Sequence, residues 1–231
     1  MAAPRVERPL RAGVLSWSGG KDSSLALWQG RRLGWTIRWL LVTVTEPYRR
    51  VSMHGVREEL LEAQAAAVGV TLRKVRIPAP CTNAEYQERM GREVRALIDE
   101  GADGFAFGDL FLADIRAYRE EQLGRVGAEA RFPLWGQDTR ALARAFVREG
   151  FRARVCTVDP RYLDRSFAGA VYDEFLLDRL PANVDPCGEN GEFHTFVHDG
   201  PIFARPVPVE VGAIVERDGF VFADLVPGQA G

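Results

Sequence analysis

Short apolar runs alternate with amphipathic stretches along most of the chain, and this alternation constrains the fold more than any other feature. Apolar and β-branched runs predict strands, which we place at 13–17, 36–45, 71–77, 103–108 and 151–158. Apolar residues at helical spacing predict helices, which we place at 23–33, 56–69, 82–99, 114–124 and 139–149. Strands that alternate with helices in this way form a parallel sheet with helices packed on its faces.

Several of these helices carry residues that favour a start or a stop. Thr82 and Glu85 have the spacing of a capping box, and Asp138 stands where an N-cap would stand. Gly69 is expected to end the second helix, because glycine tolerates the left-handed conformation found there. The apolar stripe of that helix consists of Val56, Leu60, Ala63, Ala67 and Val68.

The chain changes character past residue 180, where turn-forming residues become frequent. Two alternating runs follow between residues 207 and 225, and Asp218-Gly219 between them predicts a hairpin. We therefore expect an α/β protein with a parallel-sheet domain over residues 10–130 and a smaller α+β subdomain over residues 131–226.

The composition excludes several classes of protein. Of 231 residues 46% are hydrophobic, and the formal net charge of -2 does not favour a nucleic-acid partner. No apolar run reaches the roughly 18 residues of a membrane span, and charges near the start argue against a signal peptide, so we expect a cytoplasmic protein. Cys81, Cys156 and Cys187 are widely spaced, which predicts free thiols rather than disulfides or metal ligands.

A glycine-rich segment, Ser18 to Ser23 (SGGKDS), lies between the first predicted strand and the first predicted helix. At this place in a parallel sheet, backbone N–H groups and the positive end of the helix dipole bind anions. Lys21 is one of only two lysines among 30 basic residues and adds a full positive charge. A plain turn would need a single glycine and a capping residue, so the segment favours a phosphate site.

The spacing excludes two common phosphate loops. Lys21 is followed by Asp22, and Leu15 stands where a Walker loop has its first glycine. The sequence contains no Gly-x-Gly-x-x-Gly fingerprint. The segment instead matches the pyrophosphate loop of the ATP pyrophosphatases, which split ATP into AMP and pyrophosphate.

The second half of the chain narrows this resemblance. Residues 184–203 (VDPCGENGEFHTFVHDGPIF) resemble the signature of the diphthine–ammonia ligase family, and residues 105–109 (FAFGD) and 132–138 (FPLWGQD) resemble further segments of it. The resemblance implies an adenine nucleotide alpha-hydrolase-like, Rossmann-like domain followed by a small subdomain. It also implies that ATP adenylates a carboxylate, that pyrophosphate departs, and that ammonia displaces AMP to form an amide.

The resemblance and the chemistry of the loop imply roles for individual residues. Lys21 would balance charge as pyrophosphate leaves, and Asp22, joined by Asp109, would hold Mg²⁺. Glu189 and Glu192 would receive ammonium or orient the acceptor, although turn chemistry alone favours a solvated hairpin there. The expected ATP contacts are Ser16, Ser18, Gly19, Gly20, Lys21, Asp22, Ser23, Thr43, His54 and Gly108. The expected acceptor contacts are Glu189, Asn190, Gly191, Glu192, His194 and Thr195.

The sequence leaves the acceptor open. The Glu-Gly-Gly-Glu of the family stands here as Glu-Asn-Gly-Glu at 189–192, and arginine in place of nearly all lysine favours a GC-rich bacterial source. The expected partners are ATP, ammonia or ammonium, and a carboxylate carried by protein-bound diphthine or by a small metabolite; a homodimer is possible. The alternatives are a bacterial paralogue that adenylates or amidates such a metabolite, and a protein that binds ATP or AMP without turnover. A transfer RNA modifier is disfavoured by the charge and by the lack of catalytic cysteines.

Overall fold

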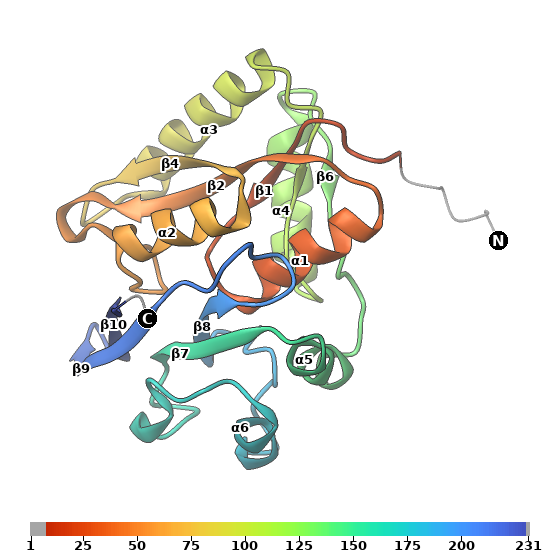
Figure 1. The fold of residues 1–231 in the computed structure, drawn as a ribbon. Helices are drawn as coiled ribbons and strands as arrows, with labels where there is room; N and C mark the ends of the chain where they lie inside the picture. Colours follow the sequence, from red (N-terminus) through yellow and green to blue (C-terminus); the bar gives the residue numbers. More distant parts are fainter. Residues whose placement is uncertain (1–7, 230–231) are drawn as a thin grey trace.

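The computed structural model describes residues 8–229, and within this range the first half of the chain forms a six-stranded, mostly parallel sheet (Figure 1). The parallel strands lie in the order β4-β2-β1-β5-β6, while β3 pairs antiparallel with the end of β2. β2 and β4 lie on one side of β1, whereas β5 and β6 lie on its other side, so the strand order switches between β1 and β5. Open α/β sheets bind ligands at such a switch point. The strands are β1 (Gly13–Ser16), β2 (Ile37–Thr45), β3 (Arg50–Val51), β4 (Thr71–Ile77), β5 (Gly104–Ala106) and β6 (Ala130–Arg131).

Helices cover both faces of this sheet because its strands are apolar on both sides. Alternate residues of β1 face opposite ways: Leu15 joins a hydrophobic cluster with α1 and α2, and Val14 joins a second cluster with α3 and α4. The helices are α1 (Lys21–Arg32), α2 (Glu58–Val68), α3 (Asn83–Asp99) and α4 (Ala113–Gly124), and a short 3-10 turn, η1 (Glu46–Tyr48), follows β2.

The second half of the described chain forms a four-stranded antiparallel sheet in the order β8-β7-β10-β9. It lies below the first sheet in Figure 1, with β8 closest to α1. Its elements are α5 (Thr139–Arg148), β7 (Arg152–Val158), the 3-10 turn η2 (Arg165–Phe167), α6 (Glu174–Arg179), β8 (Phe193–Asp199), β9 (Val209–Arg217) and β10 (Phe220–Pro227).

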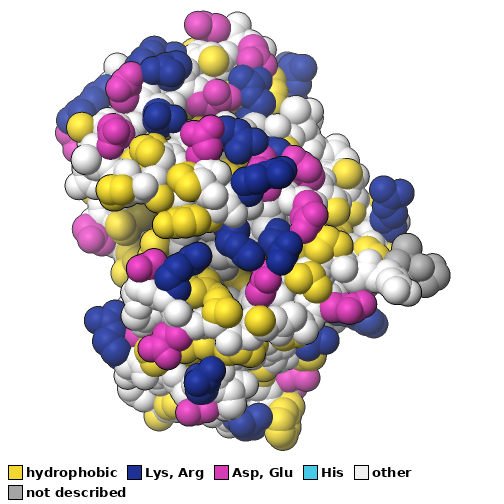
Figure 2. Space-filling view, turned by 90° about the vertical axis from the view of Figure 1, so that its left-hand side faces the viewer, with side chains coloured by type: hydrophobic (Ala, Val, Ile, Leu, Met, Phe, Trp, Pro, Cys, Tyr) yellow, Lys and Arg dark blue, Asp and Glu magenta, His cyan; other side chains and the backbone are white. Residues whose placement is uncertain are grey.

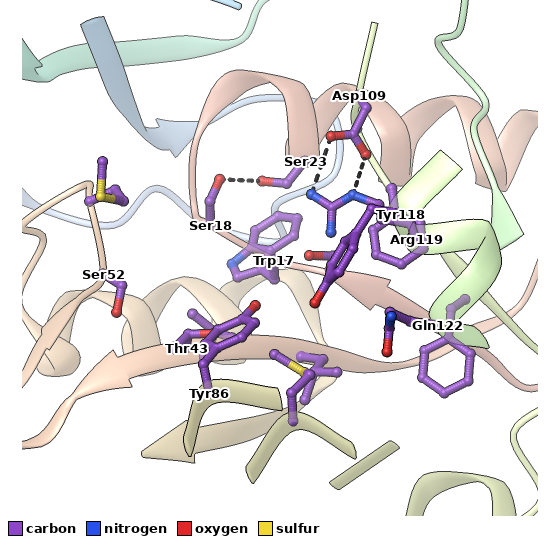
Figure 3. Close-up of a pocket in the computed structure, with 18 of the residues that line it drawn as sticks. Trp17, Ser18, Ser23, Thr43, Ser52, Tyr86, Asp109, Tyr118, Arg119 and Gln122 are labelled. Carbon is purple, nitrogen blue, oxygen red and sulfur yellow. Dashed lines mark hydrogen bonds and ion pairs between the residues drawn. The ribbon is translucent and has the colours of Figure 1, made fainter. Parts of the chain in front are cut away.

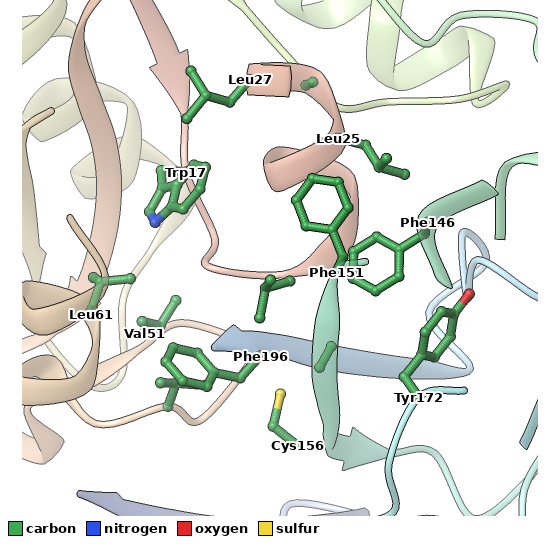
Figure 4. Packing of buried hydrophobic residues seen from close by; sticks show 14 of the residues in the cluster. Trp17, Leu25, Leu27, Val51, Leu61, Phe146, Phe151, Cys156, Tyr172 and Phe196 are labelled. Atoms are coloured by element: carbon green, nitrogen blue, oxygen red, sulfur yellow. The ribbon is translucent and has the colours of Figure 1, made fainter. Parts of the chain in front are cut away.

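One hydrophobic core joins the two sheets. Trp17 and Leu25 of the first half share a cluster of buried side chains with Phe151 and Phe196 of the second half (Figure 4). Phe146 stacks on Phe151 at a ring-centroid distance of 4.8 Å inside this cluster. The two sheets are therefore held against each other by close packing of shared side chains.

The expected fold class and most local signals are confirmed. α3 begins with the Thr82–Glu85 capping box, Asp138 caps α5, and Gly69 ends α2 with a φ of 74°. The hairpin turn is also found, with positive φ angles of 54° at Asp218 and 80° at Gly219. The cysteines are free thiols: Cys81, Cys156 and Cys187. The division of the chain into two domains near residue 130 stays a prediction.

Three expectations differ from the structure. The strand expected at 151–158 is found as β7 but lies in the antiparallel sheet rather than in the parallel one. β8 is absent from the predicted strands, because the glycine and asparagine residues just before it favoured a turn-rich segment. In α2, Ala63 is exposed and Gln64 is buried in the apolar stripe instead.

On the face shown in Figure 2, basic and acidic side chains are interspersed with hydrophobic ones. Positive charge is therefore spread over this face rather than gathered into one patch. None of the helices between residues 8 and 229 has both the length and the apolar character needed to cross a lipid bilayer.

A buried carboxylate joins the start of α2 to β4. Glu58 is 2% exposed and lies 2.8 Å from the Lys74 Nζ and 2.5 Å from the Arg76 Nη2. Burial alone would raise the pKa of Glu58, but the hydrogen bonds from Lys74 and Arg76 lower it from 4.5 to about 2.

We expect Glu58→Gln to lower the free energy of unfolding by about 1–3 kcal/mol at pH 7, because two cations lose their anion. Because the folded pKa lies below the unfolded one, this contribution is complete above pH 4.5 and is lost as the pH falls towards 2. Urea unfolding at pH 7 and at about pH 3 should therefore show the gap between variant and wild type narrowing in acid. Glu59→Gln, at an exposed neighbour, is the control; a gap that does not change with pH would contradict the assignment.

Candidate active site

The glycine-rich loop connects β1 to α1 in a conformation that requires glycine. Gly19 has a φ of 78°, and a Cβ there would lie 2.8 Å from the Gln64 Oε1. Gly20 is the N-cap of α1, and a Cβ on it would lie 3.0 Å from the Thr195 carbonyl oxygen. One side of the loop is thus packed closely against the protein, while Ser18, Asp22 and Ser23 line a cavity.

Strand β8 of the second sheet lies along the packed side of the loop. The Val197 N–H donates to the Gly19 carbonyl at 2.9 Å, and the Lys21 N–H donates to the Thr195 Oγ1 at 3.1 Å. These bonds attach the loop to the same strand that follows the Glu-Asn-Gly-Glu segment. The two sequence motifs therefore lie next to each other in space.

The cavity has a volume of about 680 Å³, within the range typical of small-molecule sites. It lies at the carboxyl ends of β1, β2 and β5, between α3 and α4, and reaches the loop that precedes β8 (Figure 3). The residues expected in the site that line it are Ser16, Ser18, Asp22, Ser23, Thr43, His54, Gly108, Asp109, Glu189, Gly191 and His194.

Six of the expected residues are not among those that line the cavity: Gly19, Gly20, Lys21, Asn190, Glu192 and Thr195. The Lys21 side chain is buried and its Nζ is 2.8 Å from the Asp22 Oδ2, while it also donates to the Cys187 carbonyl. Burial alone would lower the pKa of Lys21, but the Asp22 carboxylate raises it, so Lys21 remains a cation.

Glu192 stabilises the loop in which it lies. It is 1% exposed and accepts hydrogen bonds from the Asp185 N–H at 3.0 Å and from the Asn190 N–H and Nδ2 at 2.9 Å each. A carboxylate held by several such donors fixes the backbone around it. Asn190, which is exposed, thus contributes to the shape of the loop through Glu192.

Glu189 points the other way, into the cavity, where its Oε1 accepts from the Leu110 N–H at 2.8 Å. The pKa of Glu189 is raised from 4.5 to about 7, chiefly by burial. The Leu110 hydrogen bond acts against this rise, and the nearby Asp22 carboxylate adds to it. A carboxyl group that titrates near neutral pH can accept and release a proton.

Two histidines from different halves of the protein stack beside the loop. His54 follows β3 and His194 lies on β8, with ring centroids 4.3 Å apart and planes inclined by 28°. Burial lowers the pKa of His194 to about 4 and that of His54 well below its usual value, and the Lys21 charge acts in the same direction on both. Both rings are therefore neutral at pH 7 and can donate or accept hydrogen bonds.

The two aspartates expected to bind metal differ in what surrounds them. The Asp22 Oδ1 is buried and lacks a hydrogen-bond partner among the described residues. Asp109 instead forms an ion pair with Arg119 at 2.8 Å, drawn in Figure 3. Within residues 8–229, no cluster of three His, Cys, Asp or Glu residues could hold a metal ion by itself.

Gly108 allows the segment that follows β5 to touch the start of α1. A Cβ at Gly108 would lie 2.8 Å from the Asp22 carbonyl carbon and 3.1 Å from the Ser23 nitrogen. Such contacts are too short for any side chain, so glycine is required for the two segments to meet.

The sequence did not predict that α3 and α4 form part of the cavity wall. In Figure 3, Tyr86 of α3 and Tyr118, Arg119 and Gln122 of α4 lie around the same space as Thr43. These residues belong to no motif and carry no signal beyond their helical spacing. Gln64 was also missed, although a lone amide within an apolar stripe is a usable signal of a polar contact in the core.

This fold and site define a class: an open α/β sheet with a glycine-rich loop at its switch point and a second unit closing the cavity. Residues 11–130 match the family model of the diphthamide synthase N-terminal domain, and residues 138–221 match that of the diphthamide synthase C-terminal domain. The first match alone covers more than half of the chain. The chain belongs to the diphthamide synthase family, which confirms the resemblance seen in its sequence.

Several relatives are named diphthine–ammonia ligase. The human protein is 26% identical over 192 residues, covering 77% of this chain and 70% of the relative. The protein of Danio rerio is 25% identical over 238 residues, covering 90% of each. A Schizosaccharomyces pombe relative is 25% identical over 142 residues, which is 59% of this chain but 23% of that protein.

We expect Glu189→Gln to raise the free energy of unfolding by about 1–2 kcal/mol at pH 8, because it removes a charge from partly buried surroundings. The folded pKa of about 7 lies above the ordinary 4.5, so the cost of Glu189 is absent below pH 4.5 and grows as the pH rises to 7. Urea unfolding at pH 4.5 and pH 8 should show the gain only at pH 8. Glu192→Gln is the matched control and should lose stability at both pH values, because an amide cannot accept all three bonds. Equal stability of Glu189→Gln and wild type at pH 8 would refute the raised pKa.

Proposed function

We propose that this protein is an ATP-dependent ligase that adenylates a carboxylate, releases pyrophosphate and joins ammonia to the acyl group as an amide. The acceptor we propose is diphthine, which the names of the relatives give together with ammonia. One observation carries the proposal: the glycine-rich loop and Glu189 open into a single cavity, although they come from opposite halves of the chain.

ATP would bind with its β- and γ-phosphates at the start of α1. Backbone N–H groups and the helix dipole favour an anion there, and the hydroxyls of Ser18 and Ser23 lie 3.4 Å apart at the cavity wall. Lys21 adds a fixed cation directly behind this wall and would stabilise the charge on the departing pyrophosphate. Ser16, Thr43, His54 and Gly108 line the remainder of the proposed nucleotide site.

Magnesium fits beside Asp22, whose buried Oδ1 is free to take a ligand. Mg²⁺ is commonly held by one or two carboxylates together with substrate phosphates, so a full protein cage is not needed. Bound there, the ion would neutralise phosphate charge. Asp109 is already paired with Arg119, so we assign the metal to Asp22 and leave Asp109 as the anchor of that arginine.

Glu189 would prepare the nucleophile. Its carboxylate takes a proton from ammonium, and the ammonia so formed attacks the acyl carbon of the mixed anhydride. The new C–N bond forms as the C–O bond to AMP breaks, AMP leaves with that electron pair, and the nitrogen loses a second proton to solvent to give the neutral amide. A general base works best when its pKa lies near the working pH, which the pKa of about 7 provides. His194 and Gly191 line the cavity next to Glu189 and would contact the acceptor.

We expect wild-type protein to release AMP and pyrophosphate when ATP, Mg²⁺, ammonium and a diphthine-bearing substrate are all present. Lys21→Ala should slow pyrophosphate release by about 100-fold or more, because a fixed charge at the leaving group is lost. Lys74→Ala is the control, since the other lysine lies with Glu58 outside the cavity. Small carboxylic acids assayed in parallel test whether the protein accepts other acyl acceptors. Unchanged turnover in Lys21→Ala would refute the proposed role of Lys21 in pyrophosphate release.

The pH dependence tests Glu189 separately. In wild type, kcat/KM for ammonium should rise with pH along a limb whose apparent pKa is near 7, and Glu189→Gln should lose this limb along with most of its activity. An unchanged pH profile in Glu189→Gln would assign the proton transfer to another group.

A further inference from the structure

Gln64 is a polar side chain in the middle of the protein core. It is fully buried on the apolar face of α2, and its amide makes three hydrogen bonds. The Oε1 accepts from the Trp17 Nε1 at 2.8 Å, and the Nε2 donates to the carbonyls of Gly19 at 2.9 Å and Val197 at 2.6 Å. Because an indole can only donate and a carbonyl can only accept, the orientation of this amide is determined by its partners.

The two carbonyls bound by Gln64 belong to different halves of the protein. Gly19 lies in the glycine-rich loop, and Val197 lies on β8, whose own N–H also donates to the Gly19 carbonyl. Gly19 is thus held towards β8 by two donors while it keeps its left-handed φ of 78°. The Nε2 bonds of Gln64 therefore attach α2 to both the glycine-rich loop and β8.

The direction of the Gly19 carbonyl fixes the direction of the next N–H. In a trans peptide the C=O and the N–H point opposite ways, so a carbonyl turned towards β8 turns the Gly20 N–H away from β8. That N–H donates to the Ser18 Oγ at 3.2 Å, and Ser18 lines the cavity. If the peptide flipped, a carbonyl oxygen would face a bound phosphate and repel it.

We propose that Gln64 is a positioning residue that holds the Gly19–Gly20 peptide in the orientation needed to bind the diphosphate part of ATP. This inference rests on the proposed function. Gln64 ties the peptide to β8, which follows the loop carrying Glu189, so the phosphate-binding loop and the acceptor side form one rigid body. The binding of diphosphate then depends on the C-terminal half of the chain as well as on the glycine-rich loop itself.

The test compares two ligands that share the cavity. Gln64→Met keeps the length of the side chain and removes its hydrogen bonds. In the presence of Mg²⁺, we expect the dissociation constant of inorganic pyrophosphate to rise about tenfold, while that of AMP, which lacks the β- and γ-phosphates, changes less than about twofold. Calorimetric titrations are made well below the unfolding temperature of each protein. Gln137→Met is the matched control, because Gln137 makes one bond to the Pro133 carbonyl in an exposed turn.

A second variant tests whether two bonds to neighbouring peptides, Gly19–Gly20 and Gly20–Lys21, hold the same loop. Thr195→Val removes the acceptor of the Lys21 N–H on β8 and should also weaken pyrophosphate binding. In the double variant the loss should be smaller than the product of the single losses, because either change already frees the loop. Equal losses of pyrophosphate and AMP in Gln64→Met would indicate a structural role alone and overturn the inference.

A measurement on wild type covers the case in which Gln64→Met does not fold. Amide hydrogen exchange should show the Val197 N–H and the Gln64 side-chain hydrogens protected before any ligand is added, with little change on adding pyrophosphate. Rapid exchange of these groups in the free protein would overturn the inference while leaving the proposed function intact. Wild type that binds neither ATP nor pyrophosphate would overturn both.

Discussion

The carbonyl of Gly19 is the point on which the architecture of the site depends. It receives one hydrogen bond from the backbone of β8 and one from the side chain of Gln64, so three segments distant in sequence meet at a single oxygen atom. The shared hydrophobic core brings these segments close, but packing is not directional and cannot orient a peptide group. Hydrogen bonds supply that orientation, and burial makes each of them costly to lose.

The charges around the cavity form a pattern that explains the behaviour of Glu189. Lys21 is paired with Asp22, and Arg119 is paired with Asp109, so these two cations are already engaged before a ligand arrives. Glu189 receives a hydrogen bond from the neutral N–H of Leu110 and lies near the negative Asp22. Burial keeps the histidine pair neutral by lowering the pKa of both rings, and the charge of Lys21 acts in the same direction. Glu189 therefore combines a place in the cavity lining with a pKa near neutral pH.

The sequence predicted those features that depend on short stretches of chain. The strand–helix order, the caps at Thr82 and Asp138, and the glycine-rich loop each follow from neighbouring residues, and the structure contains them all. Sequence reasoning did not yield β8 as a strand, the burial of Gln64, or the cavity wall from α3 and α4, because these depend on partners far away in the chain. Likewise, Lys21 was expected among the ATP contacts and Glu192 among the acceptor contacts, and the structure buries both side chains outside the cavity lining.

Glu189 and Glu192 show how backbone geometry assigns different tasks to similar residues. Gly188 and Gly191 have φ angles of 64° and 85°, and a Cβ at Gly188 would lie 2.6 Å from the Phe193 carbonyl oxygen, so the loop turns tightly. This turn sends Glu189 towards Leu110 and the cavity, and sends Glu192 inward. Asn190, where the family pattern has glycine, donates twice to Glu192 and does not line the cavity. The Asn190 side chain thus has its partner within the loop, and this departure from the family pattern adds no side chain to the cavity lining.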